Sequence, residues 1–310
     1  MAFIRPDILR PPSEGPSYFL PLTKGCSNNT CAFCGFYGAK LQVRDISEVK
    51  REIDAVAMFL KTGVVDAGIP EIAYEVASGW DGQRVFLQDG DALVYPHARM
   101  KEVLEYISLR MPRVSRIASY ATAQDILRRS VAELAELKER KLDILYLGLE
   151  SGDDEVLKKI RKGSTTSQMI EAAARVKQAG IKLSVTVILG MAGPAGSEKH
   201  VKETARVLSE MDPDYVGALT LTLVPGTPLY EEHAEGRFEL ITPFESLREL
   251  TGIIRLSNFT DCFFTSMHAS NYLSVRARLP QERDRVVARL ESVIEANNPS
   301  MLRPEFLRGL

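Results

Sequence analysis

The sequence predicts an α/β protein with a parallel sheet, because segments typical of strands and of helices alternate about six times along the chain. The alternation alone leaves open whether the strands close as a barrel or form an open, doubly wound sheet. Residues of unusual chemistry, Cys26, Asp91, Glu150 and Gly190, each follow the carboxyl end of a predicted strand. Functional residues of a (β/α) barrel gather at these strand ends, so their placement favours a barrel.

Length and composition set the broad class of the protein. The 310 residues suffice for one large α/β domain, and 45% hydrophobic with 26% charged residues is ordinary for a soluble globular chain. No signal peptide and no apolar run of membrane-spanning length is visible, so we expect a cytoplasmic protein with no membrane partner. A net charge of −2 gives no general attraction to nucleic acid, and none is expected as a partner.

Apolar runs and helical periodicity place the individual elements. Strands are predicted at 18–22, 85–87, 116–120, 142–149, 181–189, 214–223 and 261–268. Helices are predicted at 47–62 with Ser47 as N-cap, and at 97–111, 124–140, 153–162, 166–179, 197–211, 243–256 and 280–296.

Three regions follow from this reading. Residues 1–17 contain four prolines and are predicted to be an extended lead-in. Residues 18–230 form the core with the strand and helix alternation. Residues 231–310 change in character and are predicted to be a C-terminal cap, a substrate-side element.

Three cysteines lie within nine residues, in the stretch Cys26-Ser27-Asn28-Asn29-Thr30-Cys31-Ala32-Phe33-Cys34. The remaining cysteine, Cys262, is far downstream. A structural zinc site takes four protein ligands, and a fourth is missing here. A [4Fe–4S] cluster held by three thiolates leaves one iron open to a ligand that takes part in chemistry. The spacing therefore favours a catalytic cluster on Cys26, Cys31 and Cys34, with a zinc site or simply buried thiols as alternatives.

With its neighbours, this loop resembles that of the radical S-adenosylmethionine (radical SAM) enzymes, whose three cysteines usually have gaps of three and two residues; here the gaps are four and two. The resemblance covers roughly residues 17–230. It implies a partial (β/α)6 barrel of TIM type with a small α+β C-terminal extension. It also implies two cofactors, a [4Fe–4S] cluster and S-adenosylmethionine (SAM), with Phe33 beside the adenine. No further cysteine cluster suggests an auxiliary iron–sulfur domain.

The same resemblance implies further SAM-binding residues. Asp91, in Asp89-Gly90-Asp91, stands at the family's Gly-Gly-Glu motif and would meet the amino group; a capped turn is the alternative. In enzymes like coproporphyrinogen oxidase and the methylthiotransferases, a Glu or Gln at the position of Glu150 forms a hydrogen bond with the ribose. A basic residue twelve positions on, here Lys162, pairs with the SAM carboxylate. Ile188 would pack on the adenine. Glu150 as a helix cap and Lys162 as a solvated helix end remain alternatives.

The implied activity is reductive cleavage of SAM to methionine and a 5′-deoxyadenosyl radical, which takes hydrogen from a small-molecule substrate that the sequence does not identify. A reducing partner such as flavodoxin or ferredoxin would supply the electron. His268, in a polar stretch outside the shared core, is the candidate for substrate binding or proton transfer, against a purely structural role. Besides this oxidoreductase, a radical SAM methyltransferase or sulfur-inserting enzyme, and a non-catalytic iron–sulfur carrier or sensor, remain alternatives.

Overall fold

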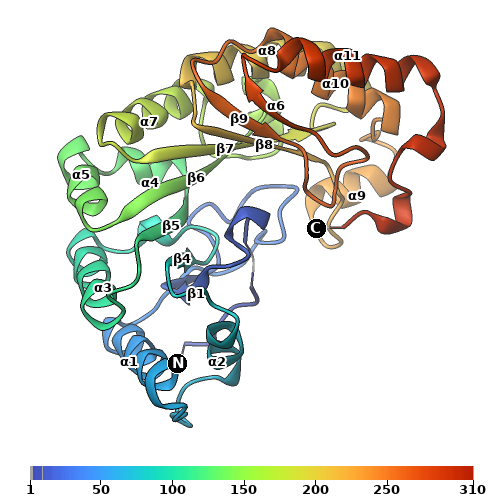
Figure 1. Cartoon of the computed structure of the whole chain (residues 1–310). Helices are drawn as coiled ribbons and strands as arrows, with labels where there is room; N and C mark the ends of the chain where they lie inside the picture. The colour runs from blue at the N-terminus through green and yellow to red at the C-terminus, as the bar shows by residue number, and fades with distance from the viewer. Residues whose placement is uncertain (1–2, 9, 310) are drawn as a thin grey trace. The chain divides into compact units, whose positions relative to one another are not determined.

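The computed structural model describes residues 3–8 and 10–309, and the chain forms two compact units (Figure 1). The N-terminal unit comprises the described residues up to Asn29, together with Gly38–Tyr146 and Arg175–Lys182. The C-terminal unit comprises Thr30–Tyr37, Leu147–Ala174 and the described residues from Leu183 onward.

The N-terminal unit is built on parallel strands. β1 (Tyr18–Pro21) pairs in parallel with β4 (Arg84–Gln88), and β4 pairs in parallel with β5 (Arg116–Ala121). The next strand of the sheet, β6 (Leu142–Glu150), begins in this unit. The strands are buried along most of their length, as is usual for parallel strands. A separate short antiparallel pair joins β2 (Thr23–Lys24) and β3 (Gln42–Val43).

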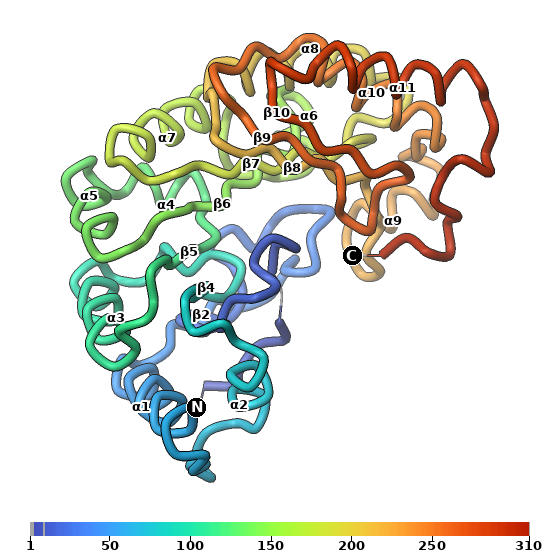
Figure 2. Tube along the Cα trace, viewed as in Figure 1, coloured from blue at the N-terminus to red at the C-terminus, as the bar shows by residue number. Residues whose placement is uncertain are grey.

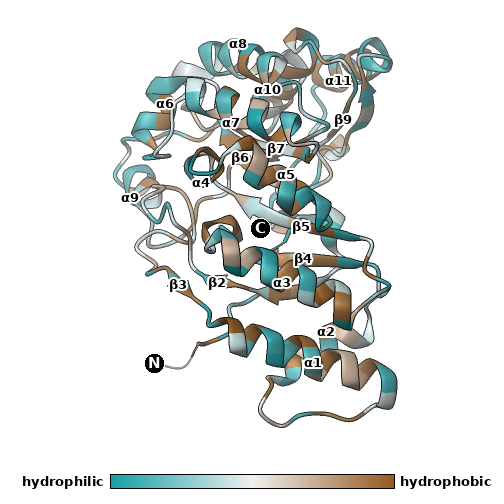
Figure 3. Cartoon of the chain, turned by 90° about the vertical axis from the view of Figure 1, so that its left-hand side faces the viewer, coloured by the Kyte–Doolittle hydropathy of each residue, from teal (hydrophilic) through white to brown (hydrophobic). Residues whose placement is uncertain are grey.

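Helices of this unit pack against one another, with α1 contacting both α2 and α3. Polar and apolar residues alternate along α1 and α3 (Figure 3). Most of the apolar ones, such as Ile53 and Leu104, are buried, whereas Leu60 and Leu109 are exposed. The predicted extended lead-in contains a short 3-10 helix, and its residues 1, 2 and 9 lie outside the described part of the chain. The helical elements are η1 (Pro12–Glu14), α1 (Ile46–Thr62), α2 (Glu71–Ser78), η2 (Ala92–Val94), α3 (His97–Arg110), α4 (Ala123–Leu127) and α5 (Val131–Glu139).

Two helix predictions in the N-terminal unit were wrong in detail, both because of capping. The N-cap of α1 is Asp45, whose side chain accepts the N–H of Ser47, rather than Ser47 itself. The helix predicted over 124–140 is two helices, since Thr122 caps α4 and Ser130 caps α5 in a capping box.

The sheet of the C-terminal unit contains the last residues of β6, then β7 (Lys182–Leu189) and β8 (Tyr215–Thr220). β7 and β8 are parallel, with Thr186 opposite Gly217. Helix α6 ends earlier than predicted and α8 begins earlier, with a proline in its first turn, a position that proline favours. The helices between these strands are α6 (Asp154–Lys159), α7 (Thr166–Gln178) and α8 (Gly193–Met211).

The C-terminal extension lengthens the sheet of this unit, because β9 pairs in parallel with β8 and β10 pairs antiparallel with β9. Helix α10 packs against both α8 and α11. The end of the chain turns back from α11 toward α9 (Figure 2). The predicted α+β extension is thereby confirmed, whereas its boundary at 230 stays a prediction. Its elements are α9 (Pro228–Ala234), α10 (Pro243–Leu256), β9 (Cys262–Thr265), β10 (Arg276–Leu279), α11 (Arg283–Ala296), η3 (Pro299–Met301) and η4 (Glu305–Leu307).

None of the helices within residues 3–8 and 10–309 combines the length and the apolar character that crossing a bilayer requires.

Candidate functional site

Strand β6 ends in a strained acidic residue. Glu150 adopts the left-handed conformation, with φ 63, which costs a non-glycine residue on the order of 1–3 kcal/mol. Its Oε1 accepts a hydrogen bond from Lys162 Nζ at 2.7 Å, and the side chains are only 9% and 15% exposed. The pair lies over Gly148, where a Cβ atom would stand 2.1 Å from Glu150 Oε1 and 2.9 Å from Lys162 Nζ. A side chain at position 148 would therefore displace the ion pair.

The turn after α6 directs Lys162 back toward the strand. Arg161 takes the left-handed conformation, with φ 56, and the N–H of Lys162 donates to the carbonyl of Leu157 at 2.9 Å. This is the hydrogen bond of a Schellman motif, usually formed around a glycine. The sequence separation of Glu150 and Lys162 thus corresponds to a strand end, a short helix and a tight helix cap.

The segment Thr30–Tyr37, which carries two of the three clustered cysteines, is fixed in the C-terminal unit by its backbone. The N–H of Ala32 donates to the carbonyl of Ile160 at 2.8 Å. The carbonyl of Ala32 accepts the N–H of Leu229, also at 2.8 Å. The cysteine segment is therefore tied both to the turn after α6 and to the start of α9.

Cys31 is buried and Cys34 is partly exposed. Burial raises the pKa of the Cys31 thiol to about 11, and the positive charge of Lys162 opposes this rise, while Cys34 and Glu150 add to it. Two of the predicted cluster ligands and the Glu150–Lys162 pair therefore share one electrostatic environment.

Phe33 and Ile188, both predicted to lie beside the adenine, belong to one apolar cluster. Phe33 packs against its buried core while remaining partly exposed itself. The buried members of the cluster are Val156, Leu157, Ile160, Ile188, Met191, Leu221, Leu229 and Phe238. An apolar surface of this kind suits one face of a purine ring.

In the N-terminal unit, Cys26 Sγ lies 3.9 Å from the carbonyl oxygen of Gly90. Asp91 is fully buried beside a second acid, Asp125, and the hydroxyl of Ser27 is 2.6 Å from a carboxylate oxygen of each. Burial and the Asp125 carboxyl raise the pKa of Asp91 well above its usual range. Against the effect of burial, the pKa of Asp125 is lowered in turn, in part by its hydrogen bonds with Ser27 and Thr122, because two adjacent buried negative charges repel and only one is readily stabilised. The contact of Asp91 with the SAM amino group stays a prediction.

His268 serves a turn in the extension. Its Nδ1 accepts the N–H of Ser270 at 3.2 Å and lies 2.9 Å from the Ser270 hydroxyl. Burial, with a smaller contribution from Arg303, lowers the pKa of the ring. The predicted catalytic role of His268 is not tested by these contacts.

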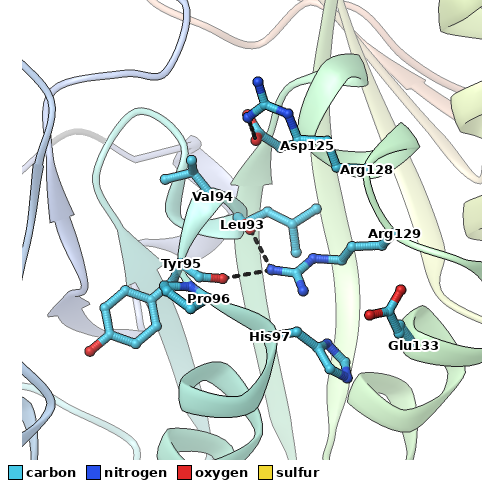
Figure 4. A pocket seen from close by; sticks show the side chains of 9 residues that line it. All are labelled: Leu93, Val94, Tyr95, Pro96, His97, Asp125, Arg128, Arg129 and Glu133. Atoms are coloured by element: carbon cyan, nitrogen blue, oxygen red, sulfur yellow. Dashed lines mark hydrogen bonds and ion pairs between the residues drawn. The ribbon is translucent and has the colours of Figure 1, made fainter.

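Each unit contains a cavity. The first, of about 240 Å³, lies in the N-terminal unit, and Arg129 donates to the carbonyls of Leu93 and Tyr95 in its wall (Figure 4). The residues predicted to bind cofactors do not line it. The second, of about 210 Å³, lies in the C-terminal unit, and Leu189, the residue after Ile188, lines it. It is lined by Leu189, Gly190, Thr220, Leu221, Leu240, Ile241, Tyr272, Glu305 and Arg308.

The sequence reading missed a buried polar network in the C-terminal unit. Glu249 and His200 are 1% and 0% exposed, and they bind the turns that follow β7 and β6, at Gly190 and Ser151. A signal was present for Glu249, because it falls on the buried stripe of its helix with Leu250 and other apolar residues.

The donor set suits the predicted cofactors. Cysteine thiolates are the ligands of iron–sulfur clusters, and a carboxylate, an ammonium and an apolar face match the polar and aromatic parts of SAM. Across residues 3–8 and 10–309, no three histidine, cysteine, aspartate or glutamate side chains are gathered around a position for a metal ion. The assignment of Cys26, Cys31 and Cys34 as ligands stays a prediction.

The fold and the motifs together define an α/β protein in which the residues predicted to bind cofactors follow the carboxyl ends of strands. The family model of the radical SAM superfamily matches residues 20–208, more than half of the chain. The chain belongs to this superfamily. Its cofactors, SAM and a [4Fe–4S] cluster, are those that the sequence predicts.

Curated relatives match over most of this chain but over less of their own length. The tRNA-2-methylthio-N(6)-dimethylallyladenosine synthase of Bordetella petrii is 26% identical over 227 residues, 72% of this chain and 44% of the synthase. The chain spans between 44% and 64% of the length of such relatives.

Solved structures share the fold. The radical SAM enzyme coproporphyrinogen III oxidase of Escherichia coli has a TM-score of 0.53 and 14% identity, over 77% of this chain and 51% of the oxidase. A radical SAM methyltransferase of Kitasatospora setae, with cobalamin and a [4Fe–4S] cluster bound, has a TM-score of 0.54 and 16% identity, over 71% of this chain and 39% of the methyltransferase. The predicted fold class, the partial barrel of radical SAM type, is confirmed.

Proposed function

We propose that this chain holds a [4Fe–4S] cluster on Cys26, Cys31 and Cys34, cleaves SAM reductively, and acts as a hydrogen-abstracting oxidoreductase on a small molecule. When bound, the cluster and SAM supply methionine and a 5′-deoxyadenosyl radical. The observation that carries the proposal is the Glu150–Lys162 pair, which stands at a strained strand end in the electrostatic environment of two of the cysteines.

The residues of the C-terminal unit have separate tasks in this proposal. Glu150 accepts hydrogen bonds from the ribose hydroxyls, and Lys162 pairs with the SAM carboxylate. Before SAM arrives, the two side chains neutralise each other at 2.7 Å, which keeps both ordered in a mostly buried place. Phe33 and Ile188 supply the apolar surface for the adenine. Asp91, in the other unit, is assigned to the amino group.

The C-terminal extension is assigned to the substrate side. The cavity of the C-terminal unit is lined by Leu189, at the end of β7, and by Leu221, directly after β8. Tyr272 and Arg308 of the extension also line it. Arg308 Nη2 donates to the carbonyl of Leu221 at 3.1 Å, which ties the end of the chain to β8. Residues 231–310 therefore contribute walls to a space beside the proposed cofactor site. His268, which does not line this cavity, is the candidate in the extension for substrate binding or proton transfer.

The test is anaerobic reconstitution followed by reduction with SAM present. Wild-type protein is expected to bind about four irons per chain and to release methionine and 5′-deoxyadenosine. Substitution of any one of Cys26, Cys31 and Cys34 by alanine removes the cluster and both products, whereas Cys262→Ala, the matched control, keeps them. Reduced flavodoxin or ferredoxin in place of dithionite tests the predicted electron donor.

The outcomes separate the alternatives. A full cluster without either product would identify an electron carrier or sensor and refute the enzyme proposal. Loss of the cluster only in Cys262→Ala would refute the ligand assignment. Similarity to a methylthio synthase and a methyltransferase makes methyl or sulfur transfer the second candidate. Product masses that increase by a methyl group or by sulfur would favour that candidate over simple hydrogen abstraction.

A further inference from the structure

Glu249, on helix α10 of the extension, binds the turn after β7 from within the protein. Its Oε2 accepts the N–H of Gly190 at 2.7 Å, and its Oε1 accepts the hydroxyl of Ser197 at 2.7 Å. The side chain is 1% exposed. Because placing a carboxyl group in the interior is unfavourable without compensating bonds, both oxygens are engaged.

The same turn is held by packing. Gly190 has φ 82, a left-handed conformation that suits glycine, and a Cβ atom there would lie 2.9 Å from Ile241 of the extension. A Cβ atom on Gly193 would lie 3.1 Å from the carbonyl oxygen of Glu239. Contacts from the extension thus fix the backbone directly after Ile188, at several points.

His200, on α8, binds the turn after β6. Its Nδ1 lies 2.8 Å from the hydroxyl of Ser151, the residue that follows Glu150. The Ser151 hydroxyl oxygen accepts the N–H of Asp153, and the hydroxyl group donates its own proton to His200 Nδ1. The proton of the neutral imidazole ring is therefore on Nε2. Nε2 faces Glu249 Oε2 at 3.8 Å, and the ring also interacts with the backbone of Ile188.

We propose that Glu249 and His200 are positioning residues that fix the turns after β7 and β6, so that the extension sets the affinity of the core for SAM. The inference rests on the proposed function, in which Glu150 and Ile188 contact the ribose and the adenine. Glu150 directly precedes Ser151, whose hydroxyl contacts His200, and Ile188 lies two positions before Gly190, whose N–H donates to Glu249. Neither Glu249 nor His200 touches the cofactor in this proposal.

The experiment measures SAM binding and backbone exchange in reconstituted protein without a reductant, so that no turnover occurs. Glu249→Ala is expected to weaken SAM binding about tenfold and to speed hydrogen–deuterium exchange over residues 188–197 in the SAM-free protein. Glu249→Gln, which keeps a carbonyl oxygen for the Gly190 N–H, restores both. His200→Ala should act in the same way over residues 150–154, with rescue by His200→Asn. Iron content should be unchanged throughout.

A matched control is Glu291→Ala, which removes an exposed acid from the neighbouring helix α11 and should change neither quantity. If wild-type protein binds SAM and Glu249→Ala binds it equally well, the inference is overturned and the proposed function stands. If wild-type protein with a full cluster binds no SAM, the proposed function fails and the inference falls with it. Faster exchange with unchanged affinity would reduce the network to a structural role and also overturn the inference.

Discussion

Replacing Glu249 by glutamine should change how stability depends on pH. Burial raises the pKa of Glu249 from 4.5 to about 7, against hydrogen bonds from Ser197 and Gly190 that lower it. The folded protein therefore keeps a proton that the unfolded chain releases, and stability falls as pH rises from 4.5 to about 7. At roughly 1.4 kcal/mol per pH unit, the full effect is about 3 kcal/mol.

His200 has the opposite dependence. Burial lowers its pKa from 6.5 to about 4, so the unfolded chain binds a proton that the folded protein does not, and stability rises with pH over this range. The two trends offset each other between pH 4.5 and 6.5 in the wild type. In Glu249→Gln only the histidine trend remains. The stability of the variant relative to wild type should therefore increase by about 2 kcal/mol between pH 5 and pH 6.5.

Urea denaturation of both cofactor-free proteins at several pH values measures this difference. Each protein gives a curve of unfolding free energy against pH. Subtracting the wild-type curve from that of the variant removes the contributions of the ionisable groups that both proteins share, including Glu245 on the same helix and Asp153 near His200. A difference that stays constant from pH 5 to pH 6.5 would refute the assignment of a buried, protonated carboxyl to Glu249.

Two further predictions concern packing and use the same denaturation assay. Gly152→Ala should lower the free energy of unfolding by at least about 2 kcal/mol, because its Cβ would lie 2.3 Å from the carbonyl oxygen of Glu203. In the control Gly217→Ala, in β8, the new Cβ meets nothing within 4 Å, so the free energy of unfolding should change little. Leu134 is fully buried, so Leu134→Ala should lower the free energy of unfolding by about 2–5 kcal/mol. Leu109 is 72% exposed, so Leu109→Ala should change the free energy of unfolding by no more than about 0.5 kcal/mol. Equal losses in the two variants would contradict this difference in burial.

The strands of the core could be predicted because each is an apolar run between polar or glycine-rich turns. β10 (Arg276–Leu279) escaped prediction, since its alternation of arginine with apolar residues is short and its stability depends on pairing with β9. α9 also escaped, although Thr227 accepts a capping hydrogen bond and Pro228 occupies the first turn. Those two residues form a recognisable helix start, and the signal was available in the sequence.

The candidate site could be predicted only where its residues are close in sequence or follow a strand. Glu150 was singled out because it follows a buried strand, and its pairing with Lys162 in one site was implied by the family resemblance; the structure adds their direct contact. Glu249 could be suspected as an acid on a buried helix stripe, but its partner, the Gly190 N–H, is 59 positions away and carries no side-chain signal. Backbone groups that need a distant partner are invisible to pattern analysis, because every residue except proline has the same N–H.

Two unfavourable features coincide at the carboxyl end of β6, and stability does not account for either. A mostly buried ion pair is often no more stabilising than apolar residues of similar size, and a glutamate with φ 63 is strained where glycine would not be. Both become useful if a ligand replaces the internal partner of each charge. The strained turn then holds Glu150 over Gly148, and Lys162 is already in place beside it. On binding, the contact between Glu150 and Lys162 would be replaced by one contact of each side chain with the ligand, and neither side chain would have to be ordered anew. The proposed binding of SAM would therefore account for both features of this strand end, the strain and the buried ion pair, which a contribution to folding alone does not.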